Sequence, residues 1–161
     1  MKLIFLDIDG VLNSNFTDEY TKSGSLFVDD NKIRLLKRLI NETGAKVVLS
    51  STWRVGWSHL ELGVQSQLMY DFVELREKLW EHGIELYDRT VILDAFMRRR
   101  GEEIQAYLDS REEFNKLFAA EDDEVAGSET NRAAEYALEP IAVGILDINA
   151  PGSVTAGVGN G

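Results

Sequence analysis

LIFLDIDGVLN, residues 3–13, decides the fold class of this chain of 161 residues. Its apolar run at residues 3–6 is continuous rather than alternating, which is typical of a strand buried on both faces inside a parallel sheet. The run ends at Asp7, and Asp9 and Gly10 follow closely. The stretch therefore predicts a central strand whose carboxyl end carries two acidic side chains and a glycine that lets the backbone turn.

The next segment predicts a helix and a second buried strand. Asp29 and Asp30 can cap the helix start, and Gly44 stands where a left-handed C-terminal cap belongs. Apolar residues at helical spacing lie between these caps: Ile33, Leu36, Leu39 and Ile40. The short apolar run at residues 47–49 then ends in the polar residues Ser50, Ser51 and Thr52. Strand, helix and strand in this order predict a βαβ unit.

The alternation of helices and strands continues to about residue 150. Spaced apolar residues predict one helix that Gly83 closes and a second, later helix: Leu68, Phe72, Leu75 and Leu79, then Ile104, Tyr107 and Leu108. Further candidates are strands at 84–87, 117–120 and 141–146 and a helix at 131–138. We expect a three-layer, Rossmann-like α/β domain over residues 1–150, with a mostly parallel central sheet. Residues 151–161 are rich in glycine and small side chains and are expected to form a flexible tail.

Composition narrows the class of protein and its chemistry. Hydrophobic residues make up 44% of the chain, enough for one domain with a sizeable core. The formal net charge of -11 disfavours binding to extended nucleic acid, which is itself polyanionic. The chain has no cysteine, so disulfides, thiolate zinc sites and cysteine nucleophiles are excluded and metal binding must rely on carboxylates. No apolar run approaches membrane-spanning length, which predicts a soluble, cytoplasmic protein without a membrane partner.

Two polar clusters follow the first two predicted strands. One holds Asp7, Asp9 and Gly10, and the other is the run Ser50-Ser51-Thr52-Trp53-Arg54. Parallel strands bring their carboxyl ends to one edge of the sheet, which is where ligands of such folds bind. At this edge Asp7 could attack phosphorus while Asp9 reaches the leaving oxygen. A plain turn or a calcium loop is the alternative, but a calcium loop needs early oxygen ligands that Val11-Leu12-Asn13 does not supply.

These motifs resemble those of the haloacid dehalogenase-like (HAD) phosphohydrolases. LIFLDIDGVLN is similar to the first motif of that superfamily, and VVLSSTWR and RGEEIQAYL resemble the small HAD domains of RNA-repair proteins. The resemblance implies that Asp7 is the nucleophile, Asp9 the general acid and base, and Ser50, with Ser51 beside it, the phosphate-binding group. It also implies a Mg²⁺ ion held by Asp7 and the backbone carbonyl of Asp9. An aspartate at the second position separates phosphatases from P-type ATPases, which carry threonine there, and from dehalogenases.

The resemblance further implies a basic residue just before a helix that leads back to the sheet. Arg98, Arg99 and Arg100 precede Gly101, and cations at this point can reach a phosphate bound over the strand ends. Arg100 is our choice because of its place in RGEEI. The alternative is that all three arginines form a solvated basic patch.

A later acidic pair should complete the magnesium site. We predict Asp122 as the ligand, supported by Asp123, because one helix and one strand fit between Arg100 and this pair. Asp147 is the alternative, since residues 141–146 before it form the more convincing strand. The pair could also belong to an acidic surface turn.

The expected function is a magnesium-dependent phosphatase that works through an aspartyl-phosphate. Residues 13–29 read as a short polar loop and residues 54–98 as one helix and one strand, so we expect no large cap over the site. An open site suits a bulky phosphorylated group, such as a polynucleotide end or a phosphoprotein. The net charge argues against binding of nucleic acid, so a small nucleotide and a 3′- or 5′-phosphorylated end both remain candidate substrates.

Two other functions stay open. One is phosphotransfer to an acceptor other than water, and the other is a non-catalytic phosphate- or partner-binding module. Arg54 and Trp57 could line a substrate groove, whereas no role is predicted for Trp53 or His59.

Overall fold

The first strand has the burial that its sequence predicts. The computed structural model describes residues 1–93 and 99–111 and the backbone of residues 144–147. Within it, β1 spans Lys2–Leu6, and Leu3, Ile4 and Leu6 are fully buried. Because successive side chains of a strand point to opposite faces, both faces of β1 are covered.

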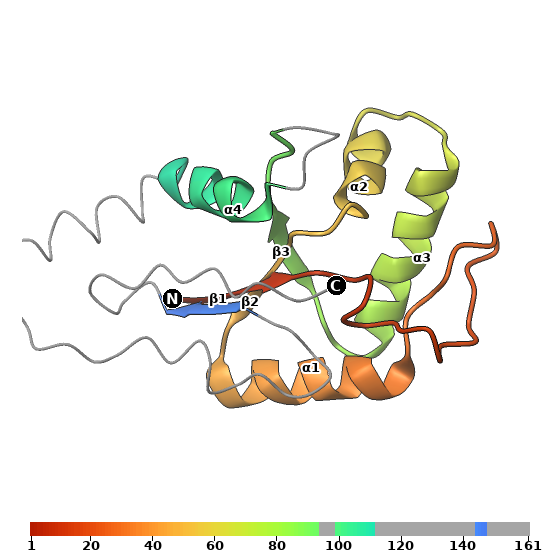
Figure 1. The fold of residues 1–161 in the computed structure, drawn as a ribbon, viewed down its shortest axis with the longest axis horizontal. Coiled ribbons are helices and arrows are strands. Elements are labelled where there is room, and N and C mark those ends of the chain that lie inside the picture. Colours follow the sequence, from red (N-terminus) through yellow and green to blue (C-terminus); the bar gives the residue numbers. More distant parts are fainter. Residues whose placement is uncertain (94–98, 112–143, 148–161) are drawn as a thin grey trace, which may run out of the picture.

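The strands in the described part of the chain form one sheet in the order β3-β2-β1-β4 (Figure 1). β2 (Lys46–Leu49) lies parallel to β1, and β3 (Leu86–Arg89) lies parallel to β2. β4 (Gly144–Asp147) lies on the other side of β1 and runs antiparallel to it. The sheet is therefore mostly parallel, and the carboxyl ends of β1, β2 and β3 lie at the same edge.

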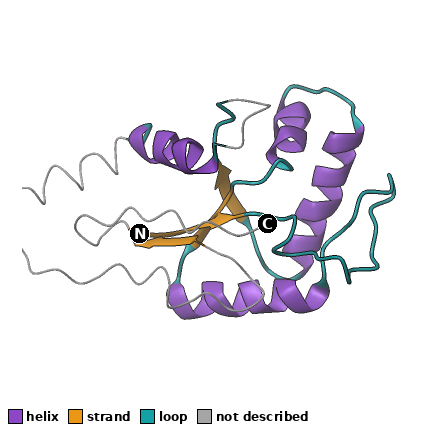
Figure 2. Ribbon diagram, in the orientation of Figure 1, coloured by secondary structure: helices purple, strands orange, loops and turns teal. Residues whose placement is uncertain are grey.

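Helices cover both faces of this sheet, which gives three layers (Figure 2). On one face, α1 (Asp30–Thr43) and α3 (Gln67–Glu81) bury their apolar side chains in a large core. On the other face, α4 (Arg100–Asp109) packs in a smaller core with Leu3, Phe5 and Val48. The predicted three-layer α/β fold is confirmed.

Helix α1 begins and ends where its sequence predicts. The Asp29 side chain accepts a hydrogen bond from the Asn31 backbone amide at 2.7 Å, which caps the first turn. Gly44 takes a left-handed conformation with φ of 67°, and its amide donates to the Ile40 carbonyl at 2.8 Å.

The prediction of a single helix between Arg54 and Arg98 is wrong. A short helix, α2 (Arg54–Glu61), precedes α3 and packs against it. Its eight residues give too little apolar periodicity to stand out in the sequence, and it contains Gly56. That glycine is needed, because a Cβ there would lie 2.0 Å from the Leu68 carbonyl oxygen of α3. The close approach of two helices, rather than helix propensity, explains the element that was missed.

Strand β3 begins two residues later than predicted, at Leu86 instead of Ile84. Gly83 is left-handed with φ of 67°, and the Ile84 amide donates to the Leu79 carbonyl at 2.9 Å. Ile84 thus belongs to the C-terminal cap of α3, where an apolar residue packs back against the helix.

Several predictions fall outside the described residues, namely the strand at 117–120, the helix at 131–138 and the tail at 151–161. The candidate strand at 141–146 overlaps β4, although β4 is antiparallel to its neighbour. In the part of the chain that is described, no helix has both the length and the apolar character needed to cross a membrane.

Candidate functional site

Asp7 lies directly after β1, at the edge where the parallel strands end. Its Oδ1 accepts a hydrogen bond from the Ile8 amide at 2.9 Å, and its Oδ2 pairs with Nη1 of Arg100. Arg100 is the first residue of α4, on the opposite face of the sheet from α1 and α3. The side chain of Asp7 is 19% exposed and that of Arg100 34%, so both can reach a ligand from solvent. The structure thus brings these two predicted residues together.

Asp9 is held by two neutral donors, one for each carboxylate oxygen. Asn13 Nδ2 donates to Oδ1 at 3.0 Å, and Trp53 Nε1 donates to Oδ2 at 3.2 Å. The Asn13 amide oxygen also accepts from the Gly10 amide at 2.8 Å, and Gly10 has φ of 83°. A residue with a side chain rarely adopts this φ, so Gly10 allows the turn in which Asn13 holds Asp9.

Sequence reasoning gave no role to Asn13 or Trp53, although both contact Asp9. Asn13 lies four residues after Asp9 and is 1% exposed. The polar residue that ends the LIFLDIDGVLN motif was therefore a usable signal. Trp53 follows β2 and meets Asp9 across 44 residues of sequence, so no local pattern could identify it.

Ser50 stands at the end of β2, next to Asp7 across the sheet. The two strands are in register, with Leu6 opposite Leu49, and the Ser50 amide donates to the Leu6 carbonyl at 2.8 Å. The Ser50 hydroxyl is completely buried and has no hydrogen-bond partner within the described residues. A buried hydroxyl without a partner costs about 1–3 kcal/mol, so a bound anion that accepts from it would be favourable.

Ser51 is also buried, but its groups are engaged in the turn that leads to α2. Its hydroxyl accepts from the Trp53 amide at 3.3 Å, and its carbonyl accepts from Arg54 Nη1 at 2.7 Å. A direct phosphate contact of Ser51 stays a prediction.

The other two arginines of the basic run do not share the position of Arg100. Arg99 pairs with Glu102 at 3.1 Å, and both side chains are at least half exposed. Arg98 lies outside the described residues.

Arg54 does not line a groove, contrary to the expectation from the sequence. It is 4% exposed, and its Nη2 lies 2.6 Å from Glu103 Oε2. Trp57, the other candidate, stacks on Phe72 with ring centroids 5.3 Å apart, and the Arg89 guanidinium lies 5.0 Å from its ring centroid. It does line a pocket, one of about 610 Å³ that it shares with Trp80 and Leu86.

Two of the predicted magnesium ligands, Asp7 and Asp9, fall within the described residues. The Asp7 carboxylate and the Asp9 backbone carbonyl are hard oxygen donors of the kind that Mg²⁺ accepts, and this ion commonly keeps several waters. Within residues 1–93 and 99–111, no three His, Asp or Glu side chains gather in a metal-binding cluster. The predicted ligands Asp122 and Asp123 lie outside the described residues.

Asp147, the alternative ligand, lies at the wrong end of the sheet. Its backbone is paired with Lys2, the first residue of β1, because β4 is antiparallel. Asp7 lies five residues further along the same direction, which is about 16 Å at 3.3 Å per residue. This register separates Asp147 from the edge that carries Asp7.

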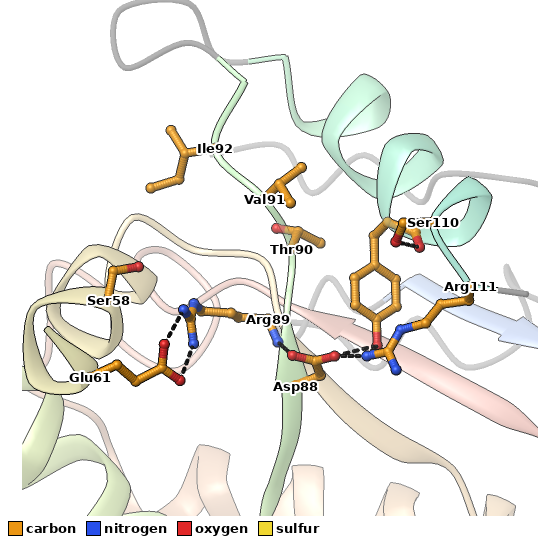
Figure 3. Close-up of a pocket in the computed structure, with 10 residues that line it drawn as sticks. Ser58, Glu61, Asp88, Arg89, Thr90, Val91, Ile92, Ser110 and Arg111 are labelled. Atoms are coloured by element: carbon orange, nitrogen blue, oxygen red, sulfur yellow. Dashed lines mark hydrogen bonds and ion pairs between the residues drawn. The ribbon is translucent and has the colours of Figure 1, made fainter.

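A separate pocket of about 720 Å³ surrounds the carboxyl end of β3 (Figure 3). Its charged side chains pair with one another: Arg89 donates to both oxygens of Glu61 at 2.9 and 2.6 Å, and Arg111 pairs with Asp88. The hydrogen bond from Arg89 lowers the pKa of Glu61. None of the site residues predicted from the sequence lines this pocket.

Comparison with known proteins identifies the family. A family model described as the HAD domain in Swiss Army Knife RNA repair proteins matches residues 3–144, most of the chain. Searches of curated proteins and of solved structures give no significant match. The matched range includes Asp7, Asp9, Ser50 and Arg100. The chain belongs to the family of HAD domains found in Swiss Army Knife RNA repair proteins.

Proposed function

We propose that this domain hydrolyses a phosphate monoester through a covalent phosphate on Asp7. The observation that carries the proposal is the buried Ser50 hydroxyl, which has no hydrogen-bond partner in the part of the chain that is described, beside the Asp7–Arg100 pair. At this edge of the sheet, Asp7 can attack phosphorus, while Arg100 and the Ser50 hydroxyl can bind the phosphoryl oxygens. Membership of the HAD family supports the same chemistry.

The two carboxylate oxygens of Asp7 have different partners, which suggests different roles. Its Oδ1 already accepts from the Ile8 backbone amide, whereas its Oδ2 faces Arg100. We assign attack on phosphorus to Oδ2. Arg100 would then contact oxygens of the phosphoryl group that bonds to Oδ2, and the Ser50 hydroxyl would donate a hydrogen bond to one of these oxygens.

Asp9 serves in both halves of the reaction. In the first, its carboxylic acid gives a proton to the leaving oxygen as the ester P–O bond breaks and the bond to Asp7 forms. In the second, its carboxylate takes a proton from the water that attacks phosphorus and releases Asp7 and phosphate. Asn13 and Trp53 keep the carboxyl group in one orientation through both steps.

Mg²⁺ is the expected cofactor, held by the Asp7 carboxylate and the Asp9 carbonyl. When bound, it would neutralise charge on the phosphoryl group during transfer. Asp122 and Asp123 are proposed to complete its ligands.

The proposed substrate is a phosphorylated nucleotide or polynucleotide end. The family description names RNA repair, and Trp53 places a partly exposed indole beside Asp9, where a base could stack. The net charge of -11 opposes a long footprint on nucleic acid, so we expect recognition of the end alone.

An assay of phosphate release tests the proposal. p-Nitrophenyl phosphate, phosphorylated mononucleotides, 3′- and 5′-phosphorylated oligonucleotides and a phosphopeptide would be compared with and without magnesium. Asp7→Asn should abolish turnover, while Asp18→Asn, an exposed carboxylate in the following loop, should be as active as the wild type. Phosphate release by Asp7→Asn at the wild-type rate would refute the assignment. Binding of phosphate without turnover on any substrate would favour a non-catalytic module.

A further inference from the structure

A buried ion pair lies close to the candidate site. Arg54, the first residue of α2, meets Glu103 of α4 with 2.6 Å between Nη2 and Oε2. The two side chains are 5% and 6% exposed and come from positions 49 residues apart. Burying two charges costs several kcal/mol per ion before their attraction is counted, so such a pair is weak evidence of a role in stability.

Both members of the pair also bind backbone groups of neighbouring loops. Arg54 Nη1 donates to the Ser51 carbonyl at 2.7 Å, in the turn that follows Ser50. Glu103 Oε1 accepts from the Leu93 amide at 3.3 Å, in the segment that follows β3. The pair therefore joins the end of β2, the end of β3 and the start of α4.

Glu103 is three residues after Arg100 on α4, so the two side chains leave the same side of the helix. Fixing Glu103 therefore fixes the rotation and position of the first turn of α4. Arg100 extends from that turn to Oδ2 of Asp7.

Arg54 is also electrostatically close to the reacting groups. Burial lowers its pKa, Glu103 opposes that shift, and smaller effects come from Arg100, which lowers the pKa, and Asp7, which raises it. Among the described residues, Glu103 is thus the main compensation for the charge on Arg54.

We propose that the Arg54–Glu103 pair is a positioning device that holds Arg100 where it meets the phosphoryl group. The inference rests on the proposed function and adds to it two residues that do not touch the substrate. It follows that Glu103 affects phosphate affinity only as long as Arg100 is present.

A double-mutant cycle tests this dependence. Wild type, Glu103→Gln, Arg100→Ala and the double variant would be compared by calorimetric binding of inorganic phosphate with magnesium, and by KM and kcat for p-nitrophenyl phosphate. Glu103→Gln leaves Arg54 without its counter-charge and should weaken phosphate binding and raise KM about tenfold, within the usual range of coupling energies. In the Arg100→Ala background the same change should have almost no further effect. Equal losses in both backgrounds would overturn the inference.

Controls separate positioning from folding. Glu42→Gln removes the exposed partner of Arg38 on α1 and should leave binding unchanged. If Glu103→Gln does not fold, the apolar pair Arg54→Met with Glu103→Met takes its place, because buried ion pairs are often replaced without loss of stability. A folded Met pair with wild-type phosphate affinity would contradict the proposal.

The calorimetry also separates this inference from the proposed function. A wild-type protein that binds phosphate but hydrolyses no ester would refute the phosphatase, while the Arg100-dependent effect of Glu103 could still hold. A wild-type protein that neither binds phosphate nor hydrolyses p-nitrophenyl phosphate would overturn both.

Discussion

The two sides of the candidate site are held in different ways. On the β1 side, the hydrogen bonds that Asn13 makes to Asp9 and Gly10 span at most four residues. On the α4 side, Arg100 reaches Asp7 across 93 residues of sequence, and the Arg54–Glu103 pair spans 49. The β1 side is thus encoded in one short motif, whereas the α4 side depends on the packing of the whole domain.

This difference suggests that chemistry and positioning can be altered separately. Changes on the β1 side should alter the reaction steps and leave the fold intact. Changes behind the α4 side should alter stability or binding before they alter proton transfer.

After loss of the nucleophile itself, the largest effect is expected for Asp9→Asn on the β1 side. With an alkyl phosphate, turnover should fall about a thousandfold, because both the leaving-group proton and the activation of water depend on this carboxyl group. With p-nitrophenyl phosphate the loss should be smaller, since only the hydrolysis step then needs Asp9. The rate of alcohol release in the first turnover checks this on the two substrates, with the melting temperature as the control for folding. Equal losses on both would argue against the role of Asp9 as an acid.

The next effect concerns the packing of α2, the helix that begins at Arg54, against α3. Gly56→Ala places a Cβ 2.0 Å from the Leu68 carbonyl and 2.6 Å from the Phe72 Cβ, which forces α2 away from α3. We expect a loss of about 2–3 kcal/mol in the free energy of unfolding, measured by urea denaturation. Gly101→Ala in α4 is the matched control, because its Cβ would meet no atom within 4 Å. A Gly56→Ala protein as stable as the wild type would show that the two helices can separate without cost.

A smaller effect is expected for Asn13→Ala. The change removes the hydrogen bonds to Asp9 and to the Gly10 amide, each with a net value of about 1 kcal/mol. We expect about a tenfold loss in kcat, because Asp9 is then less well oriented. Asn15→Ala, an exposed neighbour in the same loop, is the control. Comparable losses for the two variants would mean that Asn13 does not orient Asp9.

The smallest effect concerns ion pairs between α1 and the end of α3. Lys78 of α3 and His82, the C-cap residue of that helix, bond to Asp30 of α1 and lower its pKa. Because the pKa of Asp30 is lower in the folded state, its ion pairs stabilise that state at any pH above the unfolded pKa of about 3.9. This contribution is lost as the pH falls from that value through the lower pKa of the folded state. Unfolding at pH 7 and pH 3 should show a smaller pH dependence in Asp30→Asn than in the wild type, by less than about 1 kcal/mol because the pair is partly exposed. An unchanged pH dependence would show that the ion pairs of Asp30 with Lys78 and His82 do not contribute to the free energy of unfolding.

The fold was largely predictable because its strongest signals are local. The continuous apolar strand at residues 3–6 and the caps at Asp29 and Gly44 each act within a few residues, and the structure has them where predicted. The missed helix α2 depends on the contact of Gly56 with α3, which no periodicity reveals. The start of β3 shifted because Ile84 closes the helix before it.

In the candidate site, too, the residues with local signals were predictable, and those that depend on long-range contacts were not. The residues of the first motif could be read from one stretch, whereas Trp53 and the Arg54–Glu103 pair arise from contacts 44 and 49 residues apart. Arg54 was even expected to face a groove, and it is buried instead. Burial of an arginine depends on a partner elsewhere in the chain, and the sequence around Arg54 does not contain that partner.

Covalent trapping on Asp7 is the most direct measurement of the central claim. The Asp9→Asn variant with p-nitrophenyl phosphate and magnesium should complete the first step and stall before hydrolysis, because the aryl leaving group needs little acid assistance. Mass spectrometry of the acid-quenched protein should then show one added phosphoryl group on the peptide that contains Asp7, and hydroxylamine should remove it. The label should be missing when Asp7→Asn is combined with Asp9→Asn. A phosphoryl group on any other residue, or product release by Asp9→Asn without any label on Asp7, would contradict the account.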